Sequence, residues 1–175
     1  MSDKSAQGVE PVSFSEKLAS SQAFAALFKE GMGLVEETAS YLDGPGRQDS
    51  KKLERGAALA YATESMRLTT RLMQLASWLL LHRAVKEGEM SLAQANKEKT
   101  KVKLSLGDRA DADTISLLPE ALCDLIDRSK KLNDQVRRLD ANIYAPPLAP
   151  DKPRTSNPVE RQMGLLKAAF EQDGH

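Results

Sequence analysis

The aliphatic residues of this chain are unevenly divided among residue types. Its 175 residues include 24 Leu and 22 Ala but only 7 Val and 3 Ile. Leu and Ala are strong helix formers, whereas β-sheets are enriched in β-branched and aromatic residues. We therefore expect an all-α fold. The sequence has no internal repeat with a period of about 20 to 50 residues, so a helical solenoid is not predicted.

Three long helices are predicted, from about Phe14 to Leu42, from Asp49 or Ser50 to Glu87, and from Ser116 to Ile143. The turn sequence 43–46 (Asp-Gly-Pro-Gly) separates the first two, and Gly88 can end the second. At about 1.5 Å per residue, the second helix would be roughly 57 Å long. In the third helix, Pro119 falls in the first turn, where proline is tolerated. The long connector predicts a short helix from Leu92 to about Lys99, with Ser91 and Gln94 spaced as a capping box.

Each long helix carries an apolar row with steps of three and four residues, which is typical of a packed helix. The row of the first helix is Phe14, Leu18, Ser21, Ala25, Phe28, Met32, Val35, Ala39 and Leu42. The row of the second is Tyr61, Ser65, Leu68, Leu72, Leu75, Leu79 and His82, with a further row at Leu59, Ala62, Met66, Thr69, Met73, Ala76 and Leu80. The row of the third is Ile115, Leu118, Leu122, Leu125, Ser129, Leu132, Val136, Leu139 and Ile143. These rows predict an antiparallel three-helix bundle over residues 13–144.

The first two helices have more apolar surface than two neighbours in a bundle would cover. Their apolar arcs span roughly 200°, against roughly 140° for the third helix. The excess predicts a symmetric homodimer, and the alternative is a bundle that is deeply buried or covered by the connector. Gly31 and Gly33 lie inside the first helix, where they indicate either a close helix crossing or glycines that are merely tolerated.

Composition excludes several function classes. The 25 Lys and Arg balance 25 Asp and Glu, so the chain lacks the basic field of a general nucleic-acid binder. Because the chain has one cysteine and two histidines, we expect no disulfide framework, no metal site and no cofactor. We expect a reducing, cytoplasmic location. No apolar run approaches the roughly 20 residues of a membrane span. The only basic cluster is Lys97, Lys99, Lys101 and Lys103 in the connector, which a solvated stretch explains as readily as a nucleic-acid contact.

No arrangement of residues indicates an enzyme. The chain has no Glu-x-x-His metal pair, no glycine-rich phosphate loop, and no histidine placed to activate a nucleophile. His82 is expected to be a packed histidine. Cys123 lies near Asp124 and Asp127, whose negative charges disfavour a thiolate. Catalysis is not predicted.

Two segments are candidate protein-binding sites. Glu64, Arg67, Arg71, Gln74 and Trp78 share one face of the second helix, and Trp and Arg often anchor protein interfaces. The alternative is an ordinary Glu64–Arg67 pair, with Trp78 packed under the connector.

The second candidate site lies in the C-terminal segment. Residues 145–175 form a predicted flexible, proline-rich tail, and residues 1–12 a disordered N-terminal one. A short amphipathic motif with Met163, Leu165, Leu166 and Phe170 would enter an apolar groove of a partner, unless it packs back on the bundle.

The second helix also carries the residues of a resemblance to a known family. The run Glu64-Ser-Met-Arg-Leu-Thr-Thr-Arg-Leu-Met-Gln74, followed by Ala76-Ser-Trp-Leu-Leu80 and Arg83-Ala84, resembles the signature of the RcdA family. These proteins are the regulators of CtrA degradation of α-proteobacteria. Tyr41-Leu-Asp43, Gly88-Glu89 and the third helix up to Tyr144 are similar in kind.

The resemblance implies a dimeric three-helix bundle with a flexible C-terminal tail that acts as an adaptor without catalysis. Such proteins help deliver cell-cycle regulators to the ClpXP protease, together with CpdR-like and PopA-like adaptors. A helical scaffold or localisation protein, or a small nucleic-acid-associated regulator, is the alternative reading of the sequence.

Overall fold

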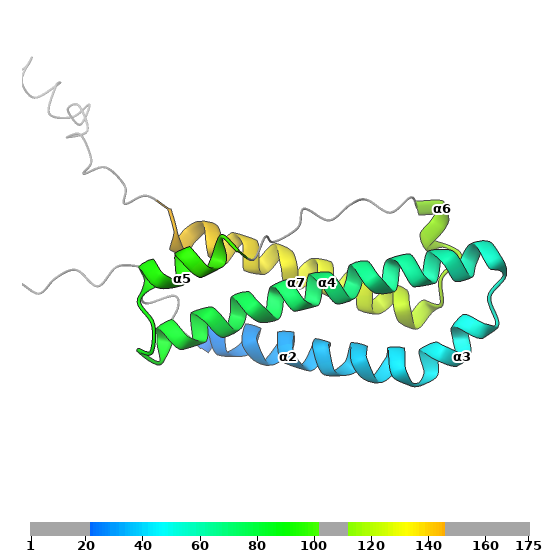
Figure 1. Cartoon of the computed structure of the whole chain (residues 1–175), viewed down its shortest axis with the longest axis horizontal. Helices are drawn as coiled ribbons and strands as arrows, with labels where there is room; N and C mark the ends of the chain where they lie inside the picture. The colour runs from blue at the N-terminus through cyan, green and yellow to red at the C-terminus, as the bar shows by residue number, and fades with distance from the viewer. Residues whose placement is uncertain (1–21, 102–111, 146–175) are drawn as a thin grey trace, which may run out of the picture. The chain divides into compact units, whose positions relative to one another are not determined.

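Figure 1 shows a computed structural model of the chain, which describes residues 22–101 and 112–145. These residues form helices and no strand, so the all-α prediction is confirmed. The start of the first predicted helix, before residue 22, lies outside the described residues. So do the terminal tails, including Met163, Leu165, Leu166 and Phe170. The helices are α2 (Gln22–Asp43), α3 (Pro45–Lys51), α4 (Arg55–Lys86), α5 (Leu92–Lys99), α6 (Ala112–Ile115) and α7 (Glu120–Ile143).

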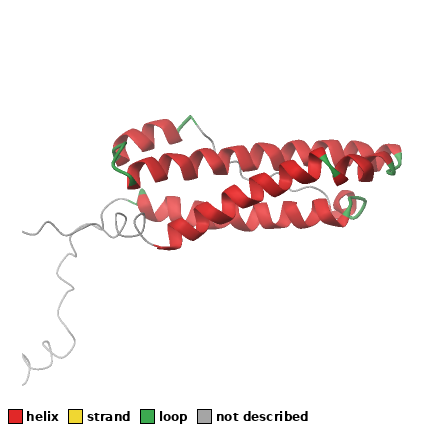
Figure 2. Ribbon diagram, turned by 90° about the horizontal axis from the view of Figure 1, so that it is seen from below, coloured by secondary structure: helices red, strands yellow, loops and turns green. Residues whose placement is uncertain are grey.

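The three long helices, α2, α4 and α7, lie side by side and share one apolar core (Figures 1 and 2). The core is continuous along α4, the longest helix, which contacts both of the others. Its largest fully buried apolar side chains come from α4 and α7: Trp78, Leu68, Leu75, Leu79, Leu122, Ile126, Leu132 and Val136. The short helices α3 and α5 pack against α4 as well.

The direction of α7 corrects the predicted antiparallel bundle. Contacts between α4 and α7 advance together along both helices, from Arg71 with Ser129 to Trp78 with Asp140, so these two helices run parallel. By contrast, α2 runs antiparallel to α7, because Glu37 contacts Arg128 near the start of α7, whereas the earlier residues of α2 lie beside Leu139 near its end. The connector, residues 87–119, allows this parallel direction, because it is long enough to return the chain to the N-terminal end of α4 before α7 begins.

Two predicted helix starts are wrong. The second long helix begins at Arg55 rather than near residue 49, because α3 forms a separate turn of helix after Gly44. Pro45 opens α3, where its missing N–H costs nothing, and the Tyr41 hydroxyl donates to Asp49 Oδ2 at 3.0 Å. The third helix begins at Glu120, because extended backbone at Pro119 separates it from α6.

Two predicted helix ends are confirmed. Just beyond α4, Gly88 has a φ of 76°, the left-handed conformation that stops a helix at low cost for glycine. The short helix α5 has the predicted bounds. Its capping box is formed, with Ser91 Oγ accepting from Gln94 N at 3.1 Å and Gln94 Oε1 accepting from Ser91 N at 3.0 Å.

The buried face of α2 is one residue away from the predicted row. The buried positions are Phe24, Leu27, Gly31, Leu34, Thr38 and Tyr41. In the predicted row, Phe28, Met32, Val35 and Leu42 are only partly buried at the edge of the core, and Ala25 and Ala39 are exposed. Both rows are largely apolar, so three- and four-residue spacing alone does not choose between them. The first predicted row on α4 and the predicted row on α7 do face the core, although Ser65 and Leu139 are only partly buried. The further row on α4 is largely exposed, and Ile115 lies in α6, where it is partly buried.

Candidate protein-interaction site

The predicted polar strip of α4 lies mostly inside the molecule. Glu64, Arg71 and Trp78 are buried, whereas Arg67 and Gln74 are half-buried. The strip faces α7, since Arg71 and Trp78 both donate hydrogen bonds to α7 side chains. An exposed binding surface is therefore the wrong interpretation for Glu64, Arg71 and Trp78. A protein-binding role for this strip stays a prediction, and the accessible atoms that would serve it belong to Arg67 and Gln74.

Trp78 is a core residue with one polar contact. Its side chain keeps 1% of its surface exposed, and Nε1 donates to Asp140 Oδ1 at 2.8 Å. The ring stacks on His82 with a centroid distance of 3.9 Å and lies 6.4 Å from the Phe24 ring of α2. The carboxylate of Asp140 thus satisfies the indole N–H that burial would otherwise leave without a partner.

Of the other two buried members of the strip, Arg71 joins α4 to α7 and Glu64 makes a contact within α4. Arg71 Nη1 donates to Ser129 Oγ at 2.8 Å, and Ser129 Oγ donates in turn to the Ile126 carbonyl oxygen at 2.7 Å. Burial lowers the pKa of Arg71, but an arginine pKa starts so high that the guanidinium stays charged. Glu64 accepts from Arg67 Nη1 at 2.7 Å within α4, which is the ordinary pair considered above.

A second polar cluster surrounds His82 at the C-terminal end of α4. The ring is fully buried, with Nδ1 2.9 Å from the Trp78 carbonyl oxygen and Nε2 3.0 Å from the Tyr144 hydroxyl. Because the carbonyl can only accept, Nδ1 carries the proton and Nε2 accepts from Tyr144. Burial lowers the pKa of His82, and burial followed by the charge of Asp140 raises the pKa of Tyr144 to about 12. His82 is therefore a packed, neutral histidine, as predicted.

A row of large apolar side chains on α4 remains in contact with solvent. Leu59, Met66, Met73 and Leu80 keep 70%, 71%, 66% and 52% of their surfaces exposed. They are spaced seven residues apart and belong to the further apolar row predicted on the second long helix. Uncharged, mostly small residues flank them on the same face: Ala62, Thr63, Thr69, Thr70, Ala76 and Ser77. We call the four exposed side chains the α4 row. Such an exposed apolar stripe is typical of an interaction surface.

Other candidate sites gain no support within the described part of the chain. No three His, Cys, Asp or Glu side chains there are grouped to hold a metal ion. Burial, together with the charges of Asp127 and Glu120, raises the pKa of Cys123, which keeps this thiol unreactive. In the lysine cluster, Lys99 pairs with Asp140 and Lys101 with Glu98, while Lys103 lies outside the described residues.

None of the helices between residues 22 and 145 that the structure describes is long and apolar enough to cross a membrane.

Comparisons with known proteins identify the family. The family described as Protein of unknown function (DUF1465) matches residues 15–170. A crystal structure of RcdA from Caulobacter crescentus CB15 matches with 51% identity and a TM-score of 0.62, covering 75% of this chain and 98% of that chain. The chain belongs to the RcdA family. No curated protein matches it.

Membership confirms the resemblance that rests on the second long helix. In this RcdA-family chain, the segment that carries the resemblance contains both the buried contacts to α7 and three side chains of the α4 row, Met66, Met73 and Leu80. The helix thus has a structural face and an exposed apolar face. The sequence contains the signal for the second, since the α4 row is apolar at steps of seven residues.

Proposed function

We propose that this RcdA-family chain is a non-catalytic cytoplasmic adaptor that helps deliver cell-cycle regulatory proteins to the ClpXP protease. The 51% identity to RcdA supports a role in regulated proteolysis. The α4 row favours an adaptor rather than an enzyme, because exposed apolar side chains of this size serve protein contacts. CpdR-like and PopA-like adaptors and cargo regulators are the expected partners.

An adaptor of this kind acts through proximity. Binding cargo and the protease complex at once raises the effective concentration of cargo near the unfoldase, without any change to a chemical bond. The proposal includes the domain scheme predicted above: a three-helix bundle over residues 13–144 that offers a rigid surface, and residues 145–175 as a tethered recognition segment.

We also propose that the chain forms a homodimer in which the α4 row packs against the same row of a second copy. Side chains with a seven-residue spacing form a seam that winds slowly around a helix, and a two-fold axis across it would pair each row with itself. Of the charged residues between 56 and 84, Glu64 and Arg71 are buried, Arg67 pairs with Glu64, and Arg83 pairs with Glu87. The small residues that flank the α4 row, such as Ala62 and Ala76, would let two helices approach closely.

The dimer is tested by measuring molar mass in solution by light scattering. Met66→Glu and Met73→Glu each place a charge in the middle of the α4 row, so we expect a dimeric wild-type protein and monomeric variants. Gln135→Glu, on exposed α7 surface, is the matched control and should remain a dimer. A monomeric wild-type protein, or variants that keep the dimer mass, would contradict the dimer.

The adaptor role is tested by reconstituted degradation of candidate cargo by ClpXP with its priming adaptor. We expect the wild-type protein to shorten the half-life of at least one cargo, whereas the Met66→Glu and Met73→Glu variants should do so less than Gln135→Glu. If the wild-type protein accelerates none of several cargos while the priming adaptor is active, delivery is wrong and a scaffold or localisation role takes its place.

A further inference from the structure

The helix α5 is held on the bundle by few apolar contacts. Of its eight residues, Leu92–Lys99, only Ala95 is buried, and Leu92 is partly buried against the core. By area, so little apolar burial contributes only weakly to the docking of α5. The capping box stabilises the helix itself rather than its contact with α4 and α7.

One charged side chain supplies the polar contact between α5 and α7. Lys99 Nζ donates to both Asp140 carboxylate oxygens at 2.9 Å and lies 3.8 Å from the centroid of the Tyr144 ring. The two side chains of the ion pair keep 19% and 20% of their surfaces exposed, so water screens this pair less than it screens a surface pair. An ammonium over an aromatic face adds to the attraction.

The partners of Lys99 also belong to the core cluster around Trp78 and His82. Asp140 accepts from Trp78 Nε1, and the Tyr144 hydroxyl lies against His82 Nε2. Neither of these two contacts involves an atom of Lys99. The Lys99 contacts can therefore break while α4 and α7 stay joined.

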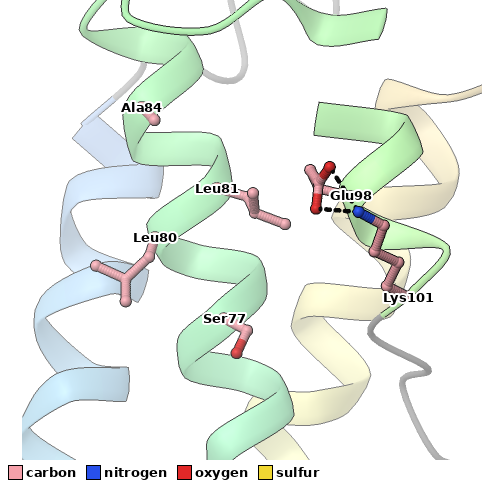
Figure 3. A pocket seen from close by; sticks show the side chains of 6 residues that line it. All are labelled: Ser77, Leu80, Leu81, Ala84, Glu98 and Lys101. Atoms are coloured by element: carbon pink, nitrogen blue, oxygen red, sulfur yellow. Dashed lines mark hydrogen bonds and ion pairs between the residues drawn. The ribbon is translucent and has the colours of Figure 1, made fainter. Parts of the chain in front are cut away.

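On its side nearest Leu80, α5 is separated from α4 by a groove. The groove has a volume of about 340 Å³ and is lined by Leu80, Leu81 and Ala84 of α4. Figure 3 shows Leu81 directed toward the ion pair between Glu98 and Lys101. The lining of the groove is mostly apolar, and Leu80 belongs to the α4 row as well. The α4 row therefore reaches this groove at Leu80.

We propose that α5 is a releasable cover on α4, with Lys99 as its latch. When the Lys99 contacts to Asp140 and Tyr144 break, α5 leaves as a unit while α2, α4 and α7 keep their packing. Its release extends the apolar face of the α4 row to Leu81 and Ala84. The inference concerns the opening of α5 itself and does not depend on a role in proteolysis.

Hydrogen–deuterium exchange of the full-length chain tests the latch. Lys99→Met keeps the alkyl chain and removes the charge, so we expect about tenfold faster amide exchange in α5 with unchanged exchange in the core of α4. Asp140→Asn is a second variant, because an amide oxygen can still accept from Trp78 while the ion pair is lost. Lys101→Met is the matched control and should exchange like the wild-type protein, since Lys101 follows α5 and pairs with Glu98 of α5 rather than with α7.

The outcomes separate three descriptions of α5. Faster exchange confined to α5 in both variants supports the latch. Wild-type exchange rates in α5 for both variants would show that Lys99 does not hold it. Equal acceleration in α5 and in the core of α4 would show that α5 opens only when the whole bundle unfolds. Either of the last two results overturns the proposal.

Discussion

The two glycines of α2 differ in their surroundings, which decides between the two interpretations left open above. A Cβ at Gly31 would collide with Leu79 Cδ1 and lie 3.6 Å from Leu132 Cδ2, whereas a Cβ at Gly33 would meet nothing within 4 Å. Gly31 thus marks the close crossing of α2 with α4 and α7. Gly33 is tolerated on an exposed surface.

This difference predicts opposite effects for the same substitution. Gly31→Ala should lower the free energy of unfolding by about 1–2 kcal/mol, because Leu79 is fully buried and has little room to move. Gly33→Ala, the matched control, should raise it by up to about 1 kcal/mol through helix propensity. Urea denaturation measures both. A stabilising Gly31→Ala would contradict the close packing at this crossing.

His82 makes stability depend on pH in a defined direction. Burial lowers its pKa in the folded state below the ordinary value of 6.5, so the unfolded chain binds a proton more readily. The contribution of His82 to the free energy of unfolding is therefore fully present above about pH 6.5. It decreases as the pH drops below that value, by at most about 1.4 kcal/mol per pH unit. Thermal unfolding between pH 5.5 and 7.5 should show this decline. His82→Asn, which can still donate to the Trp78 carbonyl, should flatten it; an unchanged slope would assign the decline to other groups.

At the scale of helices, the sequence predicted where helices occur better than which face of each helix is buried. The capping box of α5 and the glycine after α4 are local signals, and both were correct because the residues that decide them lie within a few positions. The buried face of α2 was displaced by one residue, since Phe24 and Phe28 are both apolar and only the neighbouring helices select Phe24. The break at Pro119 was missed for a related reason: a first-turn proline and a helix-preceding proline have the same local sequence.

Trp78 shows why the candidate site was only partly predictable. Its neighbours on the helix surface, Arg71 and Gln74, are polar, so the pattern indicated a solvent-facing strip. The hydrogen-bond partners that make burial possible, Ser129 and Asp140, lie on another helix and have no signal in the α4 sequence. The α4 row, in contrast, was recognisable as surplus apolar surface, because its spacing is a property of α4 alone.

The contact between α2 and α7 predicts a measurable coupling. Arg128 donates to both carboxylate oxygens of Glu37, at 2.8 and 2.7 Å, and lowers the pKa of Glu37. Both side chains are largely accessible to solvent, so water and salt weaken the pair. Glu37→Arg and Arg128→Glu should each destabilise the protein, and the double variant should recover about 0.5 kcal/mol in a double-mutant cycle. Additive effects would contradict this alignment of α2 with α7.

At the scale of the whole molecule, the parallel course of α4 and α7 gathers several features at one end. The C-terminal turns of both helices meet there, with Trp78 and His82 on one side and Asp140 and Tyr144 on the other. The helix α5 is attached at the same end through Lys99. An up-and-down bundle would have placed the end of α7 at the opposite end of α4. The long connector therefore has a structural consequence, because it places the Lys99 latch and the last residue of α7 together.

Residues 145–175 give the last prediction, which separates the bundle from the segment that follows it. The described core is built from residues up to Tyr144, so a chain that ends at Ala145 should keep the thermal unfolding midpoint of the full-length protein. Under the proposed function, it should lose most of its acceleration of cargo degradation, because the motif with Met163, Leu166 and Phe170 is then missing. Equal acceleration by both forms would assign the necessary contact to the bundle. The dimer that the α4 row is proposed to form would then be sufficient for that contact, and Met66→Glu should abolish acceleration in the truncated chain as well.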